Sequence, residues 1–483
     1  MSKRGVAGVD STADTEAAVT PATRLKRYYS NQDLKHECAR DHRAAPQMEQ
    51  GLHLNLANVR TSALFTIVVW LGMAACLYSI AGDYHYQWDF HIYYTAAREF
   101  AAGRAPYVHI YPNPWNRSEV FLYNYSPLTL YAFQWAVPFS LEAAKWIWLG
   151  IKLVGLALLL RLWHASFERL NAGWAIVLFL ALGFNSALLR DFTAGNISTL
   201  EQLGIWLGFG LLIQGRLYAA ALVLACVSQF KFLPIAFLVL LLVNRPREGW
   251  KPFALGCIAF VAVFALNLLM GVGLFHDYRL HFADPRNEFD SRGVTNPSSL
   301  ALFRDLMDST SYTNGLPENV VAGTHIYVLY LILLALLLIR AVWKRRDRLR
   351  AADPKLLVYF ACALFTIVSP RVKDYSYILM LIPTLFVLRD LGRRGRRPDY
   401  LLLGLGLLAF GQPQQSLVPG LQVSIYLLQA YLPLFLAAGV MVYVLKTILK
   451  KPATLTTVFT PDSNNEAMAT GGVHGGQAAT LSN

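Results

Sequence analysis

Residues 62–81 read SALFTIVVWLGMAACLYSIA, an apolar run that follows Arg60 almost directly and contains no charged side chain. A helix of about 20 apolar residues is long enough to cross the hydrocarbon core of a bilayer. Residues 1–60 are polar and basic, and they are too long and too hydrophilic to form a cleavable signal peptide. The run therefore predicts an uncleaved signal anchor whose basic side faces the cytoplasm.

The composition of the whole chain also indicates a membrane protein. Of the 483 residues, 55% are hydrophobic and only 15% are charged, whereas soluble domains average about 25% charged residues. So few charged side chains cannot cover the surface of a globule of this size. The composition excludes a water-soluble enzyme, a disordered protein and a disulfide-stapled secreted module.

Further apolar runs predict an all-α, polytopic protein of about twelve transmembrane helices. The runs after the first cover residues 121–139, 143–163, 172–190, 197–214, 217–243, 252–273, 324–343, 355–369, 374–389, 400–412 and 424–446. Basic segments should face the cytoplasm, and this count places all of them there if 217–243 is one long helix. A break at Lys231 and Pro234 would instead make two half-helices and change the parity.

Three regions are expected: a basic cytoplasmic tail over 1–60, a multi-spanning domain over 61–450 and a disordered tail over 451–483. The net charge is +13, but the cations gather in short runs beside apolar segments, where they set orientation. We therefore expect no nucleic-acid partner. The five cysteines form no CxxC pair, and HxxxxH at 276–281 matches no standard ligand spacing, so neither a metal nor a cofactor is predicted.

Two large loops, 82–120 and 274–323, should lie on the extracytoplasmic side. The first contains DFHIYYTAAREFAAGRAPY at 89–107, in which Asp89, Tyr93 and Phe100 recur at helical spacing before Gly103. This pattern predicts a short helix at the membrane surface, with its aromatic face toward lipid or neighbouring spans. Asp89 is then either a functional carboxylate near the first span or only an N-cap that satisfies free helix amides.

Other polar residues interrupt the apolar pattern. A lysine such as Lys231 at the centre of a span costs about 2.5–3.5 kcal/mol, so it should face a cavity or an anion, unless it snorkels to an interface. Arg371 and Lys373 lie between two expected spans and suggest an anionic partner such as a lipid phosphate, or else an internal salt bridge with Asp374. Asn296, in TNPSSLALF at 295–303, could line a polar site.

Taken together, these features resemble the polyprenol-phosphate-sugar-dependent glycosyltransferases of family 87, within the multi-spanning C-type superfamily. They run in the family's order over residues 62–446, leaving out both tails. The matching features are DFHIY at 89–93 with Gly103 and Tyr107, Tyr125 before Ser126 and Pro127, Gly195 with Asn196, Lys231 with Pro234, Asn296 to Leu300 with Ser298, and Ser369 with Pro370 leading to Pro383.

The resemblance implies an inverting hexosyltransferase that takes its sugar, with mannose as the first candidate, from a polyprenyl-phosphate donor. The acceptor would be an extracytoplasmic glycolipid or polysaccharide at the bacterial plasma membrane, where membrane lipids surround the chain. Asp89 matches the family's catalytic carboxylate. Lys231, Arg371 and Lys373 are expected to bind the donor phosphate, and the expected substrate-binding residues are Tyr93, Tyr125, Asn196, Asn296 and Ser298. The sequence leaves the sugar, the linkage, the acceptor and the oligomeric state open.

Two other classes of protein remain possible. A transporter or lipid flippase would also be polytopic, but it would more naturally carry charges in several spans, repeated halves and short outer loops. A lipid-linked glycan ligase or polymerase would use outer arginines and a histidine. Dependence on Asp89 would separate the two enzymes, and sugar release from a labelled donor would separate both from a transporter.

Overall fold

A computed structural model describes residues 56–83, 85–107, 111–112, 120–121, 123–170, 173–245, 247–283, 293–308, 317–393 and 422–450. The chain divides into two units, Met1–Leu64 and Phe65–Asn483, and every element after α2 belongs to the second. The predicted tails over 1–60 and 451–483 lie almost entirely outside the described residues, as does the predicted span over 400–412.

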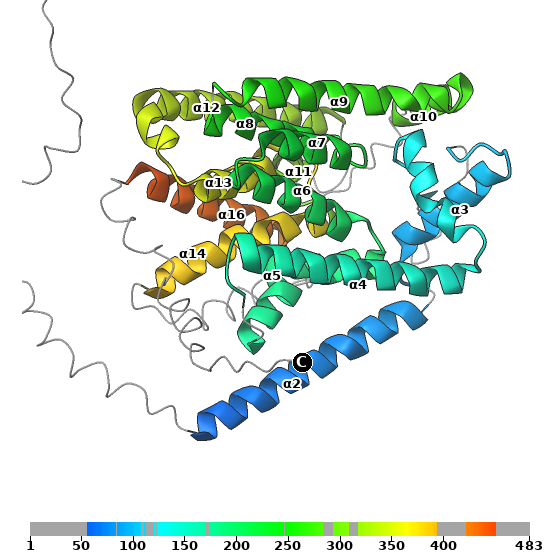
Figure 1. The fold of residues 1–483 in the computed structure, drawn as a ribbon, viewed down its shortest axis with the longest axis horizontal. Coiled ribbons are helices and arrows are strands. Elements are labelled where there is room, and N and C mark those ends of the chain that lie inside the picture. The colour runs from blue at the N-terminus through cyan, green and yellow to red at the C-terminus, as the bar shows by residue number, and fades with distance from the viewer. Residues whose placement is uncertain are drawn as a thin grey trace, which may run out of the picture. The chain divides into compact units, whose positions relative to one another are not determined.

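The described part is built almost entirely of helices (Figure 1), which confirms the all-α prediction. One antiparallel pair of two-residue strands, β1 and β2, pairs Tyr111 with Phe121. In chain order the elements are α2 (Leu56–Gly82), α3 (Trp88–Ala101), β1 (Tyr111–Pro112), β2 (Val120–Phe121), η4 (Pro127–Ala136), α4 (Leu141–Ser166), α5 (Trp174–Ala194), α6 (Ser198–Ile213), α7 (Leu217–Val227), η5 (Leu233–Leu238), α8 (Val239–Asn244), α9 (Trp250–Leu269), α10 (Val272–Ala283), η7 (Gly293–Thr295), α11 (Ser299–Asp308), α12 (Pro317–Arg350), α13 (Pro354–Val368), η9 (Asp374–Met380), α14 (Leu381–Arg393) and α16 (Gln422–Leu449).

Seven stretches of helix in the described part are long and apolar enough to cross a membrane, and four further apolar helices are shorter. The seven cover Ala63–Ile80, Leu141–Ser166, Trp174–Ala194, Trp250–Leu269, Val321–Ala341, Asp374–Gly392 and Leu427–Leu449. The chain is therefore a polytopic membrane protein, while the count of about twelve spans stays a prediction.

The expected span over 121–139 is instead the 3-10 helix η4, which is only 10 residues long. Its polar side chains explain the difference, because they bond to the neighbouring loop. Gln134 donates to the carbonyl of Ala97 in α3, and Thr129 shares a hydrogen bond with Tyr123. This segment therefore packs against α3 and helps to form a hydrophobic cluster with α3 and the start of α4.

The expected single helix over 217–243 is wrong. Helix α7 ends at Val227, and η5 and α8 follow after a break at 228–232 that contains Lys231. Pro234 supplies a physical reason, since it has no amide to donate and disfavours a helical conformation at Leu233. The parity argument for sidedness loses its basis with this break, and the extracytoplasmic position of the loops stays a prediction.

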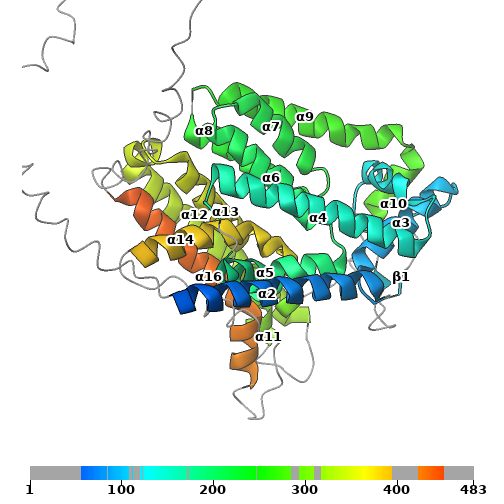
Figure 2. The same ribbon diagram turned by 60° about the horizontal axis from the view of Figure 1, so that its bottom comes forward.

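Helices α4, α6, α7 and α9 lie side by side in that order, and α3, η4 and α10 lie at one end of this layer (Figures 1 and 2). The turn between α5 and α6 meets the beginning of α3 at this end. Four segments far apart in the sequence, near residues 89, 196, 231 and 373, converge there and form the site described next.

Candidate active site

Helix α3 carries the first candidate side chain and confirms the helix predicted in the loop 82–120. It spans Trp88–Ala101, and the chain leaves it before Gly103, as the sequence indicates. Its aromatic face packs inside the protein. The ring of Phe90 is fully buried and stacks on Trp148 of α4 and on Trp135 of η4, with ring centroids 5.3 and 6.1 Å apart.

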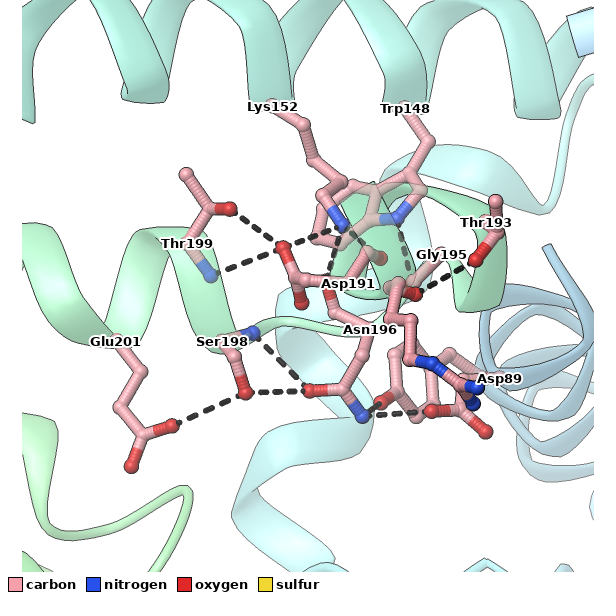
Figure 3. A network of polar contacts seen from close by, with 12 residues as sticks. Asp89, Trp148, Lys152, Asp191, Thr193, Gly195, Asn196, Ser198, Thr199 and Glu201 are labelled. Carbon is pink, nitrogen blue, oxygen red and sulfur yellow. Dashed lines mark hydrogen bonds and ion pairs between the residues drawn. The ribbon is translucent and has the colours of Figure 1, made fainter. Parts of the chain in front are cut away.

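Asp89 lies in the first turn of α3 but does not cap the helix. The N-cap residue is Gln87, and it makes no side-chain cap hydrogen bond. The Asp89 carboxylate instead accepts a 2.7 Å hydrogen bond at Oδ2 from the amide Nδ2 of Asn196 (Figure 3). In the described part of the chain, no hydrogen bond reaches the other oxygen, Oδ1, and Asp89 keeps partial exposure.

The neighbours of Asn196 fix the orientation of its amide. The backbone amide of Ser198 can only donate, and it lies 3.0 Å from Oδ1 of Asn196. The Ser198 hydroxyl donates to the same oxygen at 2.8 Å. The Nδ2 group must therefore face Asp89, and it also donates to the hydroxyl of Tyr93 at 3.0 Å. That hydroxyl shares a 2.9 Å hydrogen bond with Tyr125, so the predicted site residues Asp89, Tyr93, Tyr125 and Asn196 belong to one network.

Glycine is required at the turn that carries Asn196. Gly195 ends α5 with φ of +67°, a left-handed conformation that most side chains disfavour. A Cβ atom there would also lie 2.9 Å from Cβ of Gln87 and 3.0 Å from Cβ of Phe90. The absent side chain thus lets the start of α3 approach the turn closely, and the indole of Trp148 donates to the Gly195 carbonyl at 2.8 Å.

The predicted cations differ in their pairing. The Lys231 ammonium lies 2.6 Å from the Glu201 carboxylate and donates to the Ser198 hydroxyl at 2.6 Å. Asp374 pairs with Arg190 at 3.0 Å, so the alternative in which Arg371 or Lys373 pairs with Asp374 does not occur. Among the residues that the structure describes, Arg371 and Lys373 form no direct ion pair.

Asp89 and Lys373 influence each other's protonation. Burial raises the pKa of Asp89 from 3.8 to about 6, against the opposing effects of the Asn196 hydrogen bond and the positive charge of Lys373. Burial also lowers the pKa of Lys373 to about 8, and repulsion by Arg371 acts in the same direction. The pKa values of both groups thus lie closer to neutral pH than those of an ordinary aspartate and lysine, as is typical of residues that exchange protons or bind ions.

Asn296 and Ser298 form hydrogen bonds with the backbone of residues 370–372. The Val372 amide donates to Oδ1 of Asn296 at 2.9 Å, and the Ser298 hydroxyl donates to the Pro370 carbonyl at 2.8 Å. Both side chains therefore hold the segment that carries Arg371 and Lys373. Their predicted contact with substrate stays a prediction, and Arg371 itself is exposed.

The sequence did not predict a buried ion pair that lies next to the site. Lys152 of α4 and Asp191 of α5 lie 2.8 Å apart, and their side chains are 1% and 0% exposed. The signal was present, since Lys152 interrupts an apolar run in the same way as Lys231. Glu201, the partner of Lys231, was also missed because nothing in the sequence indicates which acid meets which base across separate helices.

Comparison with known proteins identifies one family. Residues 121–370, more than half of the chain, match the model of glycosyltransferase family 87. The match includes Tyr125, Asn196 and Lys231, whereas Asp89 precedes it and Lys373 follows it. Searches of curated proteins and of solved structures found no significant match.

Proposed function

The chain belongs to glycosyltransferase family 87, and from this premise we propose that it transfers a hexose from a polyprenyl-phosphate donor. Mannose is the first candidate for the sugar, and a glycolipid or polysaccharide outside the bacterial plasma membrane is the proposed acceptor. The observation that carries the proposal is the geometry at Asp89, where Asn196 holds Oδ2 and no described residue donates a hydrogen bond to Oδ1. Lys373, whose positive charge acts on Asp89, has no direct ion-pair partner among the described residues.

In the proposed mechanism, Asp89 is the general base. The acceptor hydroxyl attacks the anomeric carbon while a carboxylate oxygen of Asp89 takes its proton. Asn196 holds Oδ2, which leaves Oδ1 for the acceptor. Attack from the face opposite the leaving group inverts the anomeric configuration. The bond between the anomeric carbon and the phosphate oxygen breaks, and its electron pair leaves with the lipid phosphate.

Lys373 is the first candidate to meet that phosphate. Its side chain is partly buried and its charge acts on Asp89, and a cation in such surroundings stabilises a developing anion more strongly than one in water. Arg371 adds a guanidinium two residues away, on the more exposed side. Lys231 would reach the phosphate only by exchanging its ion pair with Glu201, so we assign it a secondary part in donor binding.

A donor of this kind presents its sugar at the edge of a bilayer, and the chain has matching surfaces. Large apolar side chains remain exposed on its long helices, as expected where lipid covers them; examples are Leu269 in α9, Trp343 in α12 and Tyr78 in α2, which are 81%, 81% and 71% exposed. A lipid phosphate is already a competent leaving group, so the proposed reaction invokes neither a nucleotide nor a metal. The family match favours this reaction over the transporter or flippase that the sequence also allowed.

The proposal is tested by supplying donors directly. Membranes containing the protein are incubated with polyprenyl-phosphate sugars that carry different labelled hexoses, and products are identified by mass spectrometry. We expect label to move to a glycan or glycolipid with release of polyprenyl phosphate, with the mannose donor used best. Membranes containing Asp89→Asn are the matched control. Transfer from nucleotide sugars alone, with every lipid-phosphate donor inert, would contradict the proposal.

The pKa of Asp89 predicts an acid limit to activity. The base works only when deprotonated, so kcat should fall as the pH drops through about 6, roughly two units above the limit set by an ordinary aspartate. The Asn196 hydrogen bond lowers the pKa of Asp89, so Asn196→Ala should move this limit to higher pH. The measurement is kcat against pH in detergent or nanodiscs. A limit near 4 in the unmodified protein would show that the pKa of the base is not raised by burial.

A further inference from the structure

The ion pair between Lys152 and Asp191 is unusual because of what surrounds it. Both residues belong to apolar stretches long enough to cross a membrane, and both side chains are almost completely excluded from solvent. Buried ion pairs are weak stabilising devices, because desolvation of two charges can cancel their attraction. This pair also leaves Oδ1 of Asp191 without a hydrogen bond. A chain selected for stability alone would be served as well by apolar side chains at both positions.

The pair holds both ends of the turn between α5 and α6 (Figure 3). Lysine has three N–H donors, and those of Lys152 meet the Asp191 carboxylate, the Asp191 carbonyl and, at 2.7 Å, the Asn196 carbonyl. On the other side, Oδ2 of Asp191 accepts from the amide of Thr199 at 3.2 Å and from its hydroxyl. Residues 191 and 199 are thereby joined through one carboxylate, and Lys152 supports the turn between them.

This turn determines where Asp89 lies. The Asn196 carbonyl is held by Lys152, while the Asn196 side chain donates to Asp89. The Thr193 carbonyl, in the last turn of α5 just before this turn, accepts a 2.6 Å hydrogen bond from the amide of Gln87, directly before α3. The start of α3 therefore rests on the turn through its backbone and through its carboxylate, and any shift of the turn is passed to Asp89.

We propose that Lys152 and Asp191 are positioning residues for the transfer reaction, which they serve by fixing the turn that orients the Asp89 carboxylate. They touch neither the proposed donor nor the acceptor. The inference rests on the proposed role of Asp89 as general base. It assigns the buried pair a task in aligning base and acceptor, beyond any contribution to folding.

Kinetics of Lys152→Met provide the first test. This variant keeps an unbranched apolar side chain but removes all three donors. A misplacement of about 1 Å at a reacting group can lower a rate about 100-fold, so we expect kcat to fall by about that factor. Donor KM should change by less than about twofold, because the phosphate-binding cations lie on other segments. A similar loss in kcat/KM that comes from a higher donor KM, with kcat unchanged, would overturn the proposal.

Thr199 supplies a milder test that does not leave a buried charge unpaired. Thr199→Val removes the hydroxyl that donates to Asp191, whereas Thr199→Ser keeps it. We expect kcat of Thr199→Val to fall about 10-fold and that of Thr199→Ser to stay near the unmodified value, since one hydrogen bond of this kind is worth about a factor of 10. Loss in both variants or in neither would contradict the positioning role, even if Lys152→Met fails to fold.

An ion pair away from the site provides the matched control. Glu168 and Arg389 lie 3.1 Å apart, and neither contacts the turn or Asp89. Arg389→Met should lower thermal stability without changing kcat. If Asp89→Asn is inactive while Lys152→Met and Thr199→Val keep full kcat, only the positioning proposal fails. If Asp89→Asn is active, the proposed base itself is wrong.

Discussion

Replacing Asp89 with Asn is expected to lower kcat by about 10²- to 10⁴-fold, the usual contribution of a general base, with little effect on folding. The amide has the size of the carboxylate, and its oxygen can still accept the hydrogen bond from Asn196. It cannot take a proton from an alcohol. The loss should therefore appear in kcat for transfer from a lipid-phosphate donor, measured with purified protein whose thermal unfolding matches that of the unmodified chain.

Glu99→Gln is the matched control for this substitution. Glu99 lies at the other end of α3 and pairs with Arg104 rather than with the Asn196 network. Its neutralisation changes the charge of the same helix by the same amount and should leave kcat unchanged. Near-normal turnover of Asp89→Asn would remove Asp89 from the reaction, whatever the donor.

Lys373→Met is expected to give the second largest loss, about 10²-fold or more in kcat/KM for the donor. The substitution keeps much of the side-chain volume while removing the partly buried ammonium proposed to meet the phosphate. The charge of Lys373 also lowers the pKa of Asp89, so its removal should move the acid limit of kcat to higher pH. Initial rates at varied donor and acceptor concentrations, repeated across pH, measure both effects.

Comparison with Arg371 tests whether the effect depends on the position of the cation or only on its charge. Arg371 is exposed, where solvent screens its charge, so Arg371→Met should weaken donor use less than Lys373→Met. If Lys373→Met alters acceptor kinetics alone, the phosphate assignment is wrong. If Lys231→Met weakens donor use more than Lys373→Met does, Lys231 is the main phosphate ligand. Lys231 would then exchange its ion pair with Glu201 for one with the donor phosphate on binding.

Much of the fold could be predicted because its signals are local. Apolar runs identified the helices, and Gly103 identified the end of α3. Hydrogen bonds between polar side chains and segments distant in the sequence were less predictable. The segment over 121–139 looked like a span because hydropathy does not reveal that Gln134 and Thr129 bond to the neighbouring loop. Pro234 indicates the break between α7 and η5, whereas the parity of the charged segments favours one continuous helix.

The candidate site was predictable to the extent that single residues look out of place. Asp89 and Lys231 were found as charges beside or within apolar segments. Pairing could not be predicted, because Lys152 and Asp191 are separated by 39 residues and meet only after α4 and α5 pack. The partner of Asn296 could not be predicted either. An amide side chain can hydrogen-bond to the backbone or to a ligand, and the sequence does not distinguish the two; the structure shows that Asn296 accepts from the backbone amide of Val372.

The packing of α3 has a consequence for how substrates arrive. Phe90, adjacent to Asp89, is fully enclosed and stacked on two tryptophans, and the backbone before it bonds to the turn after α5. Such an anchored helix cannot swing out as a lid. In the proposed mechanism the base is thus held in place, and the lipid-linked donor brings its sugar to it. An opening that admits such a donor would then come from segments other than α3.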